Sequence, residues 1–285
     1  MEPQVSVAFE GKNVLGEGPI WDAATKRLYW FDIKQALLYW GEPNTGACGS
    51  WALPCRASAA AIREAGGLLL ASEQGLADFD LETGGFVVRR PLAAPAGFRS
   101  NDGKIDVRGR FWFGTMDDHH GERPGVLYRY DPDGTLEEVL DGIHIVNTVS
   151  CSPDGRTYYL ADSRRGVIWA FDMDEAGRLS NRRVLVETAA PDGSAVDADG
   201  YLWNAQWGSW RVVRYGPDGS VDRVIEVPAA QPSSCAFGGD DLTTLFITTA
   251  REDLLEAALS EQPWAGSVLK VETGVKGLPL PRFAG

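Results

Sequence analysis

Three polar side chains lie at one repeated distance before a turn glycine, and their types could bind a metal ion or a polar substrate. Asn101, Asn147 and Asp192 each precede a glycine by eight residues, and an aromatic-rich segment follows each of these glycines. This order of polar residue, turn and strand predicts a β-hairpin with the polar side chain in front of it. A fourth side chain, Glu17, precedes its own aromatic segment by eleven residues, as Asn147 does.

Together these four side chains offer two carboxylates and two carboxamides, which is a set of oxygen donors. Oxygen donors suit hard divalent cations, of which we expect Ca²⁺ first, with Mg²⁺ and Mn²⁺ also compatible. Zn²⁺ and Fe²⁺, which more commonly take His or Cys ligands, are further alternatives. So few protein ligands would leave positions open for water and substrate, as a catalytic site requires. The structural alternative is that these residues cap turns, as Asn and Asp often do.

A short apolar or aromatic segment recurs along the chain with a nearly constant period. Its six copies are separated by 40, 43, 47, 44 and 43 residues and begin at Leu28, Leu68, Phe111, Tyr158, Leu202 and Leu245. Six repeats of three or four short strands, with turn residues between them, are typical of a β-propeller. We therefore expect an all-β, six-bladed β-propeller that forms a single domain over residues 1–285. Two β-sandwich domains are the alternative, but they would not require one repeat phase.

Equivalent positions in successive propeller blades form rings around a central channel. The four oxygen-bearing side chains fall in blades one, three, four and five, ten or eleven residues before the recurring segment. We therefore expect them to meet at one level of the channel and to form the metal site there. One short helix is expected outside the repeat, over Asp253–Leu259, because of its Leu, Ala and Glu content.

Charge and composition bear on the partners of the chain. With 285 residues, a net charge of −13 and no basic stripe, neither nucleic acid nor an anionic membrane surface is an expected partner. No apolar run approaches the ~18 residues of a membrane span. The N-terminal sequence lacks the basic and apolar regions of a secretory signal, so we expect a cytoplasmic protein. The cysteines then fit free thiols, with a disulfide between Cys48 and Cys55 as the alternative.

Other catalytic chemistries lack their motifs in this chain. There is no Gly-x-Ser-x-Gly elbow, no His-Glu-x-x-His motif, no phosphate-binding loop and no dinucleotide-binding glycine pattern. Arg99, two residues before Asn101, would place a cation at the same mouth, where it could contact substrate or form a rim salt bridge. His119 and His120 lie in a loop that leaves a strand near this mouth, so His119 is a further candidate for substrate binding, with a solvated loop position as the alternative.

Five motifs, which extend over most of the chain, resemble the SMP-30/gluconolactonase/regucalcin-like family. They are LGEGPIWD (15–22), RSNDGKID (99–106), RFWFGTM (110–116), PDGSAVDADGYLW (191–203) and SSCAFGG (233–239). The resemblance implies a six-bladed propeller with one divalent metal in its channel, in a family whose members are mostly sugar lactonases. It also implies that Glu17, Asn147 and Asp192 bind the metal, and that Asp192 is the general base. Arg99 and Asn101 match residues that contact substrate.

Two positions depart from the pattern of that family. His119 stands where animal regucalcins have a Glu, three residues after the Gly-Thr-Met segment, which leaves the identity of the substrate open. Thr148 follows Asn147 where many members have Gly, so it would add bulk near the metal while keeping the ligand.

The resemblance implies metal-dependent hydrolysis of a sugar-acid (aldono-) lactone to the open aldonic acid, in carbohydrate catabolism. The expected partner is thus a small-molecule sugar lactone, either a pentonolactone or a hexonolactone. Arg99, His119, His120 and Arg123 near one mouth could instead favour a lactone with an extra anionic group. Two other functions stay open at this point. One is a metal-dependent esterase or phosphotriesterase-like hydrolase, and the other is a non-enzymatic calcium-binding propeller.

Overall fold

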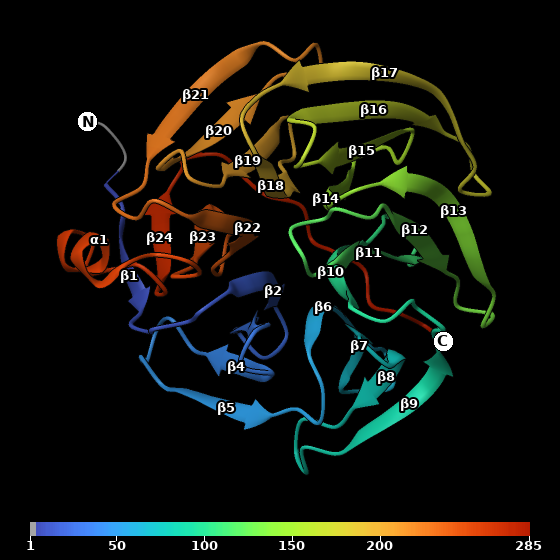
Figure 1. Ribbon diagram of the computed structural model, residues 1–285, viewed down its shortest axis with the longest axis horizontal. Helices are drawn as coiled ribbons and strands as arrows, with labels where there is room; N and C mark the ends of the chain where they lie inside the picture. Colours follow the sequence, from blue (N-terminus) through green and yellow to red (C-terminus); the bar gives the residue numbers. More distant parts are fainter. Residues whose placement is uncertain (1–3) are drawn as a thin grey trace.

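Six antiparallel sheets of four strands each surround a central axis in the computed structural model, which describes residues 4–285 (Figure 1). Successive sheets follow one another around this axis in chain order, apart from the strand that closes the ring. The prediction of an all-β, six-bladed propeller is confirmed.

In five of the blades, four consecutive strands run from the axis to the rim (Figure 1). Blade one consists of β2 (Gly16–Asp22), β3 (Arg27–Asp32), β4 (Leu37–Gly41) and β5 (Cys48–Ala52). Blade two consists of β6 (Ala57–Ile62), β7 (Leu68–Ser72), β8 (Gly75–Phe79) and β9 (Phe86–Pro91). Blade three consists of β10 (Phe98–Ile105), β11 (Phe111–Asp117), β12 (Gly125–Tyr130) and β13 (Leu136–Ile143). Blade four consists of β14 (Val146–Cys151), β15 (Thr157–Asp162), β16 (Val167–Met173) and β17 (Leu179–Glu187). Blade five consists of β18 (Pro191–Val196), β19 (Leu202–Gln206), β20 (Arg211–Tyr215) and β21 (Val221–Glu226).

Blade six joins the two ends of the chain. Its inner strands are β22 (Pro232–Gly238), β23 (Thr244–Thr249) and β24 (Val268–Glu272), and its outer strand is the N-terminal β1 (Ser6–Phe9). Pairing of β1 with β24 closes the ring, so that neither end of the chain leaves the sixth sheet open. The helix α1 (Glu256–Glu261) lies between β23 and β24 and begins three residues later than the segment predicted from composition.

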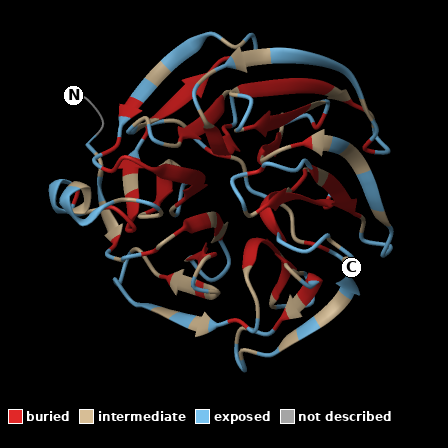
Figure 2. Ribbon diagram, in the orientation of Figure 1, coloured by how far each residue is buried: buried red, intermediate tan, exposed pale blue. Residues whose placement is uncertain are grey.

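Burial decreases from the axis to the rim, as Figure 2 shows. The second strands, β3, β7, β11, β15, β19 and β23, carry the recurring apolar segment and are almost wholly buried. Outer strands such as β5 and β17 alternate or expose their residues, because only one of their faces packs against a neighbouring blade. The core therefore consists of the layers between blades, and the inner strands that line the axis pack against them.

Every inner strand carries a β-bulge near its beginning. In all six blades the register between the first and second strands shifts by one residue, for example between Glu17 and Ile20 and between Asn147 and Ser150. A bulge redirects the side chains at the extra residue. The six bulges therefore turn a ring of side chains toward the channel, whereas a regular strand would direct these side chains elsewhere.

Two further features bear on the sequence predictions. All four cysteines are free thiols, including the pair Cys48 and Cys55. Among residues 4–285, no helix has the length and apolar character needed to cross a membrane.

Candidate active site in the central channel

The four oxygen-bearing side chains predicted from the repeat lie together in the channel. Glu17 of β2, Asn101 of β10, Asn147 of β14 and Asp192 of β18 all line one cavity of about 380 Å³. Each is at least nine-tenths buried. The cavity lies at the end of the channel where the inner strands begin. The four side chains reach the same level of the channel because the bulge recurs near the beginning of each inner strand.

Local backbone geometry explains why Glu17 can point into the channel. The next residue, Gly18, has a φ of 55° in the bulge, and its N–H donates to Glu17 Oε2 over 2.8 Å. A side chain at Gly18 would collide with the carbonyl oxygen of Ser58 on the neighbouring inner strand. Glycine is therefore required beside Glu17 by both the left-handed conformation and the close approach of β6.

Two of these side chains are carboxyls that are buried beside each other. Burial, and then the negative charge of Asp102, raises the pKa of Glu17 to about 8. Burial, and then the charge of Glu17, raises the pKa of Asp192 well above its usual range. Two buried carboxylates with too little nearby positive charge form a site that a cation would stabilise.

The donor set fits a divalent cation. Glu17 and Asp192 offer carboxylate oxygens, and within residues 4–285 Asn147 Oδ1 accepts a hydrogen bond from Asn101 Nδ2 alone, over 3.2 Å. Within residues 4–285, no cluster of three or more His, Cys, Asp or Glu side chains could by itself hold a metal ion. At this site the third donor would instead be the amide oxygen of Asn147. Oxygen ligands of this kind suit Ca²⁺ or Mg²⁺ rather than a soft metal.

Asn101 connects Asn147 to Arg99, the cationic side chain predicted at the mouth. Its Nδ2 donates to Asn147 Oδ1 and to the carbonyl of Val146, while its Oδ1 accepts from Arg99 Nη1 over 2.7 Å. The oxygen of Asn101 thus accepts from a positively charged guanidinium, which disfavours a second cation beside it and leaves Glu17, Asn147 and Asp192 as the candidate metal ligands. The Nη2 atom of Arg99 makes no hydrogen bond within residues 4–285 and can donate to a substrate in the cavity.

A single carboxylate holds Arg99 in place and joins three blades. Asp118 accepts from Arg99 Nε over 2.7 Å, from Arg56 over 2.7 Å and from Lys34 over 2.9 Å. Burial alone would raise the pKa of Asp118, but hydrogen bonds from Arg56, Arg99 and Lys34 outweigh it and hold that pKa far below its usual range. Lys34 also pairs with Glu252 over 2.9 Å, so the ion-pair network reaches the connection within blade six.

The backbone of Asp192 is fixed by two neighbours. Its carbonyl oxygen accepts from Thr148 Oγ1 over 2.6 Å and from Asn204 Nδ2 over 2.9 Å. Thr148, with a φ of 56°, is fully buried and links blade four to blade five. The hydroxyl that replaces a common glycine thus contributes a specific contact as well as bulk.

The loop after β11 places the two histidines differently. Both side chains are exposed, but His120 lines the cavity and His119 does not. The chain reverses at His120 and Gly121, which have φ values of 55° and 65°, and this turn directs adjacent residues to different sides. The substrate-binding role predicted for His119 gains no support from its position.

Several lining residues carried no recognisable signal in the sequence. They include Lys34, Ser163, Arg164, Trp207, Gln231 and Glu252. Gln231 is notable because its Oε1 is buried and has no hydrogen-bond partner within the described part of the chain, while its Nε2 donates to the carbonyl of Glu252. A turn of this side chain toward the cavity would let the unpaired acceptor receive a hydrogen bond from a substrate hydroxyl.

The fold and the cavity together define a six-bladed propeller with an oxygen-rich site at one end of its channel. A family model described as the SMP-30/Gluconolactonase/LRE-like region matches residues 15–251, and the chain therefore belongs to this family. The family expected from the five motifs is confirmed.

Individual relatives extend over nearly the whole chain. The L-arabinolactonase of Azospirillum brasilense is 38% identical, covering 99% of this chain and 96% of the relative. The 6-deoxy-6-sulfogluconolactonase of Pseudomonas putida is 34% identical over 96% of each chain. A crystal structure described as the calcium-binding protein regucalcin, from Agrobacterium tumefaciens, has a TM-score of 0.94 at 32% identity and covers 98% of this chain and 97% of that one. The lactonase names agree with the expected class of hydrolase.

Proposed function

We propose that this protein hydrolyses the lactone of a sugar acid to the open aldonic acid in carbohydrate catabolism, with a divalent cation held by Glu17, Asn147 and Asp192. The observation that carries the proposal is the pair of buried carboxyls facing an amide oxygen in one cavity. The L-arabinolactonase and the sulfogluconolactonase among the relatives support the same class of reaction. Ca²⁺ is the first choice of cation because all three donors are oxygen atoms.

Opening of the lactone ring requires a group on the protein that accepts a proton from water. A divalent cation, when bound, supplies Lewis acidity that activates the lactone carbonyl and water. Asp192 takes a proton from the attacking water as the water oxygen bonds to the carbonyl carbon. The ring C–O bond then breaks, and Asp192 returns the proton to the ring oxygen, which leaves as a hydroxyl group. Thr148 and Asn204 keep Asp192 in place during both transfers.

Orientation of the sugar falls to groups that line the cavity above the carboxyl pair. Arg99 offers its free Nη2 as a donor, and Gln231 offers its unpaired Oε1 as an acceptor. Arg99, which Asp118 holds in place, and Gln231, once its side chain turns toward the cavity, can together select the arrangement of hydroxyl groups on the lactone ring. Asn101 positions Arg99 relative to the ligand set, through the hydrogen bonds described above.

Charge at the cavity mouth bears on the substrate class. Beyond the carboxyl pair, three cationic and three anionic side chains line the cavity: Lys34, Arg99 and Arg164, and Asp118, Glu252 and Asp253. Lys34 and Arg99 are already paired with carboxylates. This balance favours a neutral pentono- or hexonolactone over one with an additional anionic group.

Substitution of Asp192 tests the proposal. Asp192→Asn keeps the shape of the side chain but cannot accept the proton, and we expect loss of lactone hydrolysis by about 10²-fold or more. The thermal transition should stay within a few degrees of the wild-type value, because the site itself disfavours a second buried negative charge. Wild-type turnover by a folded Asp192→Asn protein would contradict the assignment of Asp192.

A further inference from the structure

A second cavity, of about 300 Å³, lies at the opposite end of the central channel from the candidate active site. The inner strands contribute to both cavities, with residues near their beginnings in the first and residues near their ends in the second. On β10, for example, Asn101 lines the first cavity and Ile105 lines the second. The second cavity is therefore a separate space with its own mouth.

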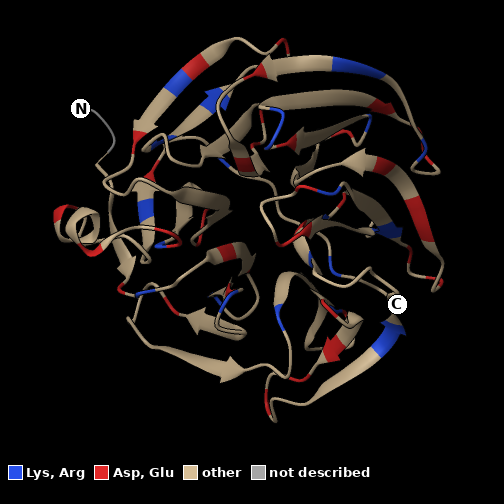
Figure 3. Ribbon diagram, viewed as in Figure 1, with Lys and Arg blue, Asp and Glu red and all other residues tan. Residues whose placement is uncertain are grey.

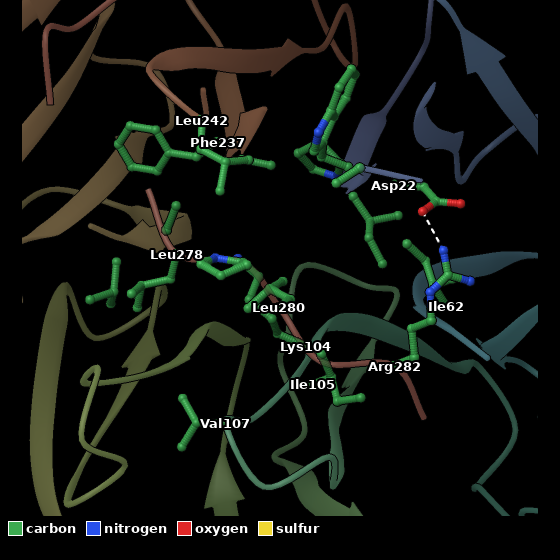
Figure 4. Close-up of a pocket in the computed structure, with 18 of the residues that line it drawn as sticks. Asp22, Ile62, Lys104, Ile105, Val107, Phe237, Leu242, Leu278, Leu280 and Arg282 are labelled. Carbon is green, nitrogen blue, oxygen red and sulfur yellow. Dashed lines mark hydrogen bonds and ion pairs between the residues drawn. The ribbon is translucent and has the colours of Figure 1, made fainter. Parts of the chain in front are cut away.

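Most of the wall of this second cavity is apolar. Figure 4 shows Ile105, Val107, Phe237 and Leu242 around it, from blades three and six and their loops. A volume of about 300 Å³ is at the lower end of the range for small-molecule sites, ~300–1,000 Å³. The space is thus large enough for a small ligand with a hydrocarbon portion.

The C-terminal segment crosses the mouth of this cavity as a strap, residues 277–283. It is attached at one end by Gly277 N–H to the carbonyl of Leu242 over 2.8 Å, and at the other by Phe283 N–H to the carbonyl of Ile62 over 2.7 Å. Between these attachments, Leu278 and Leu280 line the cavity (Figure 4). Leu280 is nevertheless 42% exposed, so the strap presents apolar surface that a ligand tail could cover.

One part of the cavity wall carries hydrogen-bond donors. Lys104 Nζ and Ser150 Oγ, both on lining residues, donate to the carbonyl oxygen of Ser194. Within residues 4–285, Lys104 makes no ion pair with a carboxylate, and an ammonium has three protons to donate. The charge of Lys104 lowers the pKa of Asp102, which burial raises, so the ammonium compensates that carboxylate only from a distance.

The remaining charges at this cavity neutralise each other. Asp22 and Arg282 form an ion pair of 2.5 Å at the rim, which Figure 4 shows as a dashed line. Asp22 is further engaged by Thr25 Oγ1 over 3.0 Å. Within residues 4–285, Lys104 is therefore the cationic side chain of this cavity wall that has no carboxylate paired directly with it.

We propose that this second cavity binds a small monoanion with an apolar tail, of the class of medium-chain carboxylates. The carboxylate accepts from a free proton of Lys104 Nζ, and the hydrocarbon chain packs among Val107, Phe237 and the strap leucines. An ammonium in an apolar wall complements one negative charge, whereas a sugar lactone with many hydroxyl groups would find too few polar partners there. The site is distinct from the proposed lactone site and does not depend on that function.

Isothermal titration of the full-length, Ca²⁺-loaded protein with octanoate tests the proposal. We expect one binding site per chain, and binding about tenfold or more weaker for octan-1-ol, which has the same tail without the charge. Lys104→Met should weaken octanoate binding by about tenfold or more, while Lys104→Arg, which keeps the charge, should lose far less.

Two controls separate the proposed site from general effects. Ala236→Leu fills the cavity while Lys104 stays in place, and it should also abolish binding, which guards against a Lys104→Met protein that is merely destabilised. A crystal soaked with 8-bromooctanoate should place bromine between Val107 and Leu280. Absence of binding at millimolar octanoate, equal affinity in the wild type and both loss variants, many weak sites per chain, or bromine in the first cavity would each overturn the proposal.

Discussion

Arg99 donates through Nε to Asp118 Oδ1 over 2.7 Å, and this contact fixes a buried guanidinium at the mouth of the candidate active site. The same carboxylate binds Lys34 and Arg56, so blades one, two and three meet at Asp118. Arg99 is thus oriented by a network and not by its own strand alone.

Asp118→Asn should raise KM for the lactone more than it lowers kcat, because Arg99 loses the partner that orients it. We expect a loss in kcat/KM of about 10- to 100-fold. Asp118→Glu, which keeps the charge, should recover part of it. Glu122→Gln, an exposed position in the same loop, is the matched control and should behave as the wild type. Steady-state kinetics on all three variants check this, and an unchanged KM in Asp118→Asn would argue against a substrate role for Arg99.

Thr148→Val removes a buried hydroxyl and keeps the shape of the side chain. The carbonyl of Asp192 would lose its 2.6 Å contact, and Asn204 would lose one acceptor. We expect destabilisation of about 1–3 kcal/mol in urea unfolding, together with a lower kcat. Thr135→Val, at an exposed position, should change neither quantity by a measurable amount. A fully stable and active Thr148→Val protein would show that this hydrogen bond does not position Asp192.

The chelated protein should become less stable as pH rises from about 4.5 to about 8. Burial raises the pKa of Glu17 from 4.5 to about 8, so in this range the folded chain holds a proton that the unfolded chain has released. The free energy of unfolding therefore falls as pH rises through that window. Added Ca²⁺ should raise the melting temperature more at pH 8 than at pH 5, because cation and proton compete for the carboxylates.

Thermal melts of the chelated wild type and of Glu17→Gln at several pH values measure this effect. The variant lacks the titrating group, so its melting temperature should decline less over the window. Parallel curves for the two proteins would mean that Glu17 does not carry the pH dependence.

Gln231→Leu removes the unpaired acceptor from the cavity wall. KM should rise about 3- to 10-fold for a lactone whose hydroxyl donates to Oε1, which corresponds to one hydrogen bond. A panel of deoxylactones identifies that hydroxyl: the lactone that lacks it should be hydrolysed equally well by wild type and variant. If the variant is impaired equally on every lactone of the panel, Gln231 does not recognise a hydroxyl group.

The repeat made much of the fold predictable. The aromatic segments that begin at Leu28, Phe111 and Leu202 are buried second strands, and a constant period between such strands can be read without any tertiary information. The same phase brought Glu17, Asn147 and Asp192 to one cavity. Closure of the ring by β1 was not predictable from the period, because this strand pairs with β24 across almost the whole chain.

Contacts between blades could not be predicted either, because they join residues that are far apart in the sequence. The pairing of Arg56 with Asp118 joins residues 62 positions apart, and neither side chain stands in a recognisable motif. That His120 lines the cavity in place of the predicted His119 depends on a single left-handed turn, which the residue preferences of the sequence do not locate. Gln231 became a candidate only through its unpaired buried oxygen, a property of the packed structure.

The most direct test of metal-dependent lactone hydrolysis is a pH-indicator assay with the chelated protein before and after addition of one equivalent of Ca²⁺. The panel should include arabinono-, xylono- and gluconolactone and one sulfo-sugar lactone, with Mg²⁺, Mn²⁺, Zn²⁺ and Fe²⁺ in parallel. We predict that acid release from a neutral lactone is restored by the cation in the wild type and not in Asp192→Asn. Release no faster than spontaneous opening on every lactone, with every cation, would contradict the proposed function and leave Glu17, Asn147 and Asp192 as a cation-binding site alone.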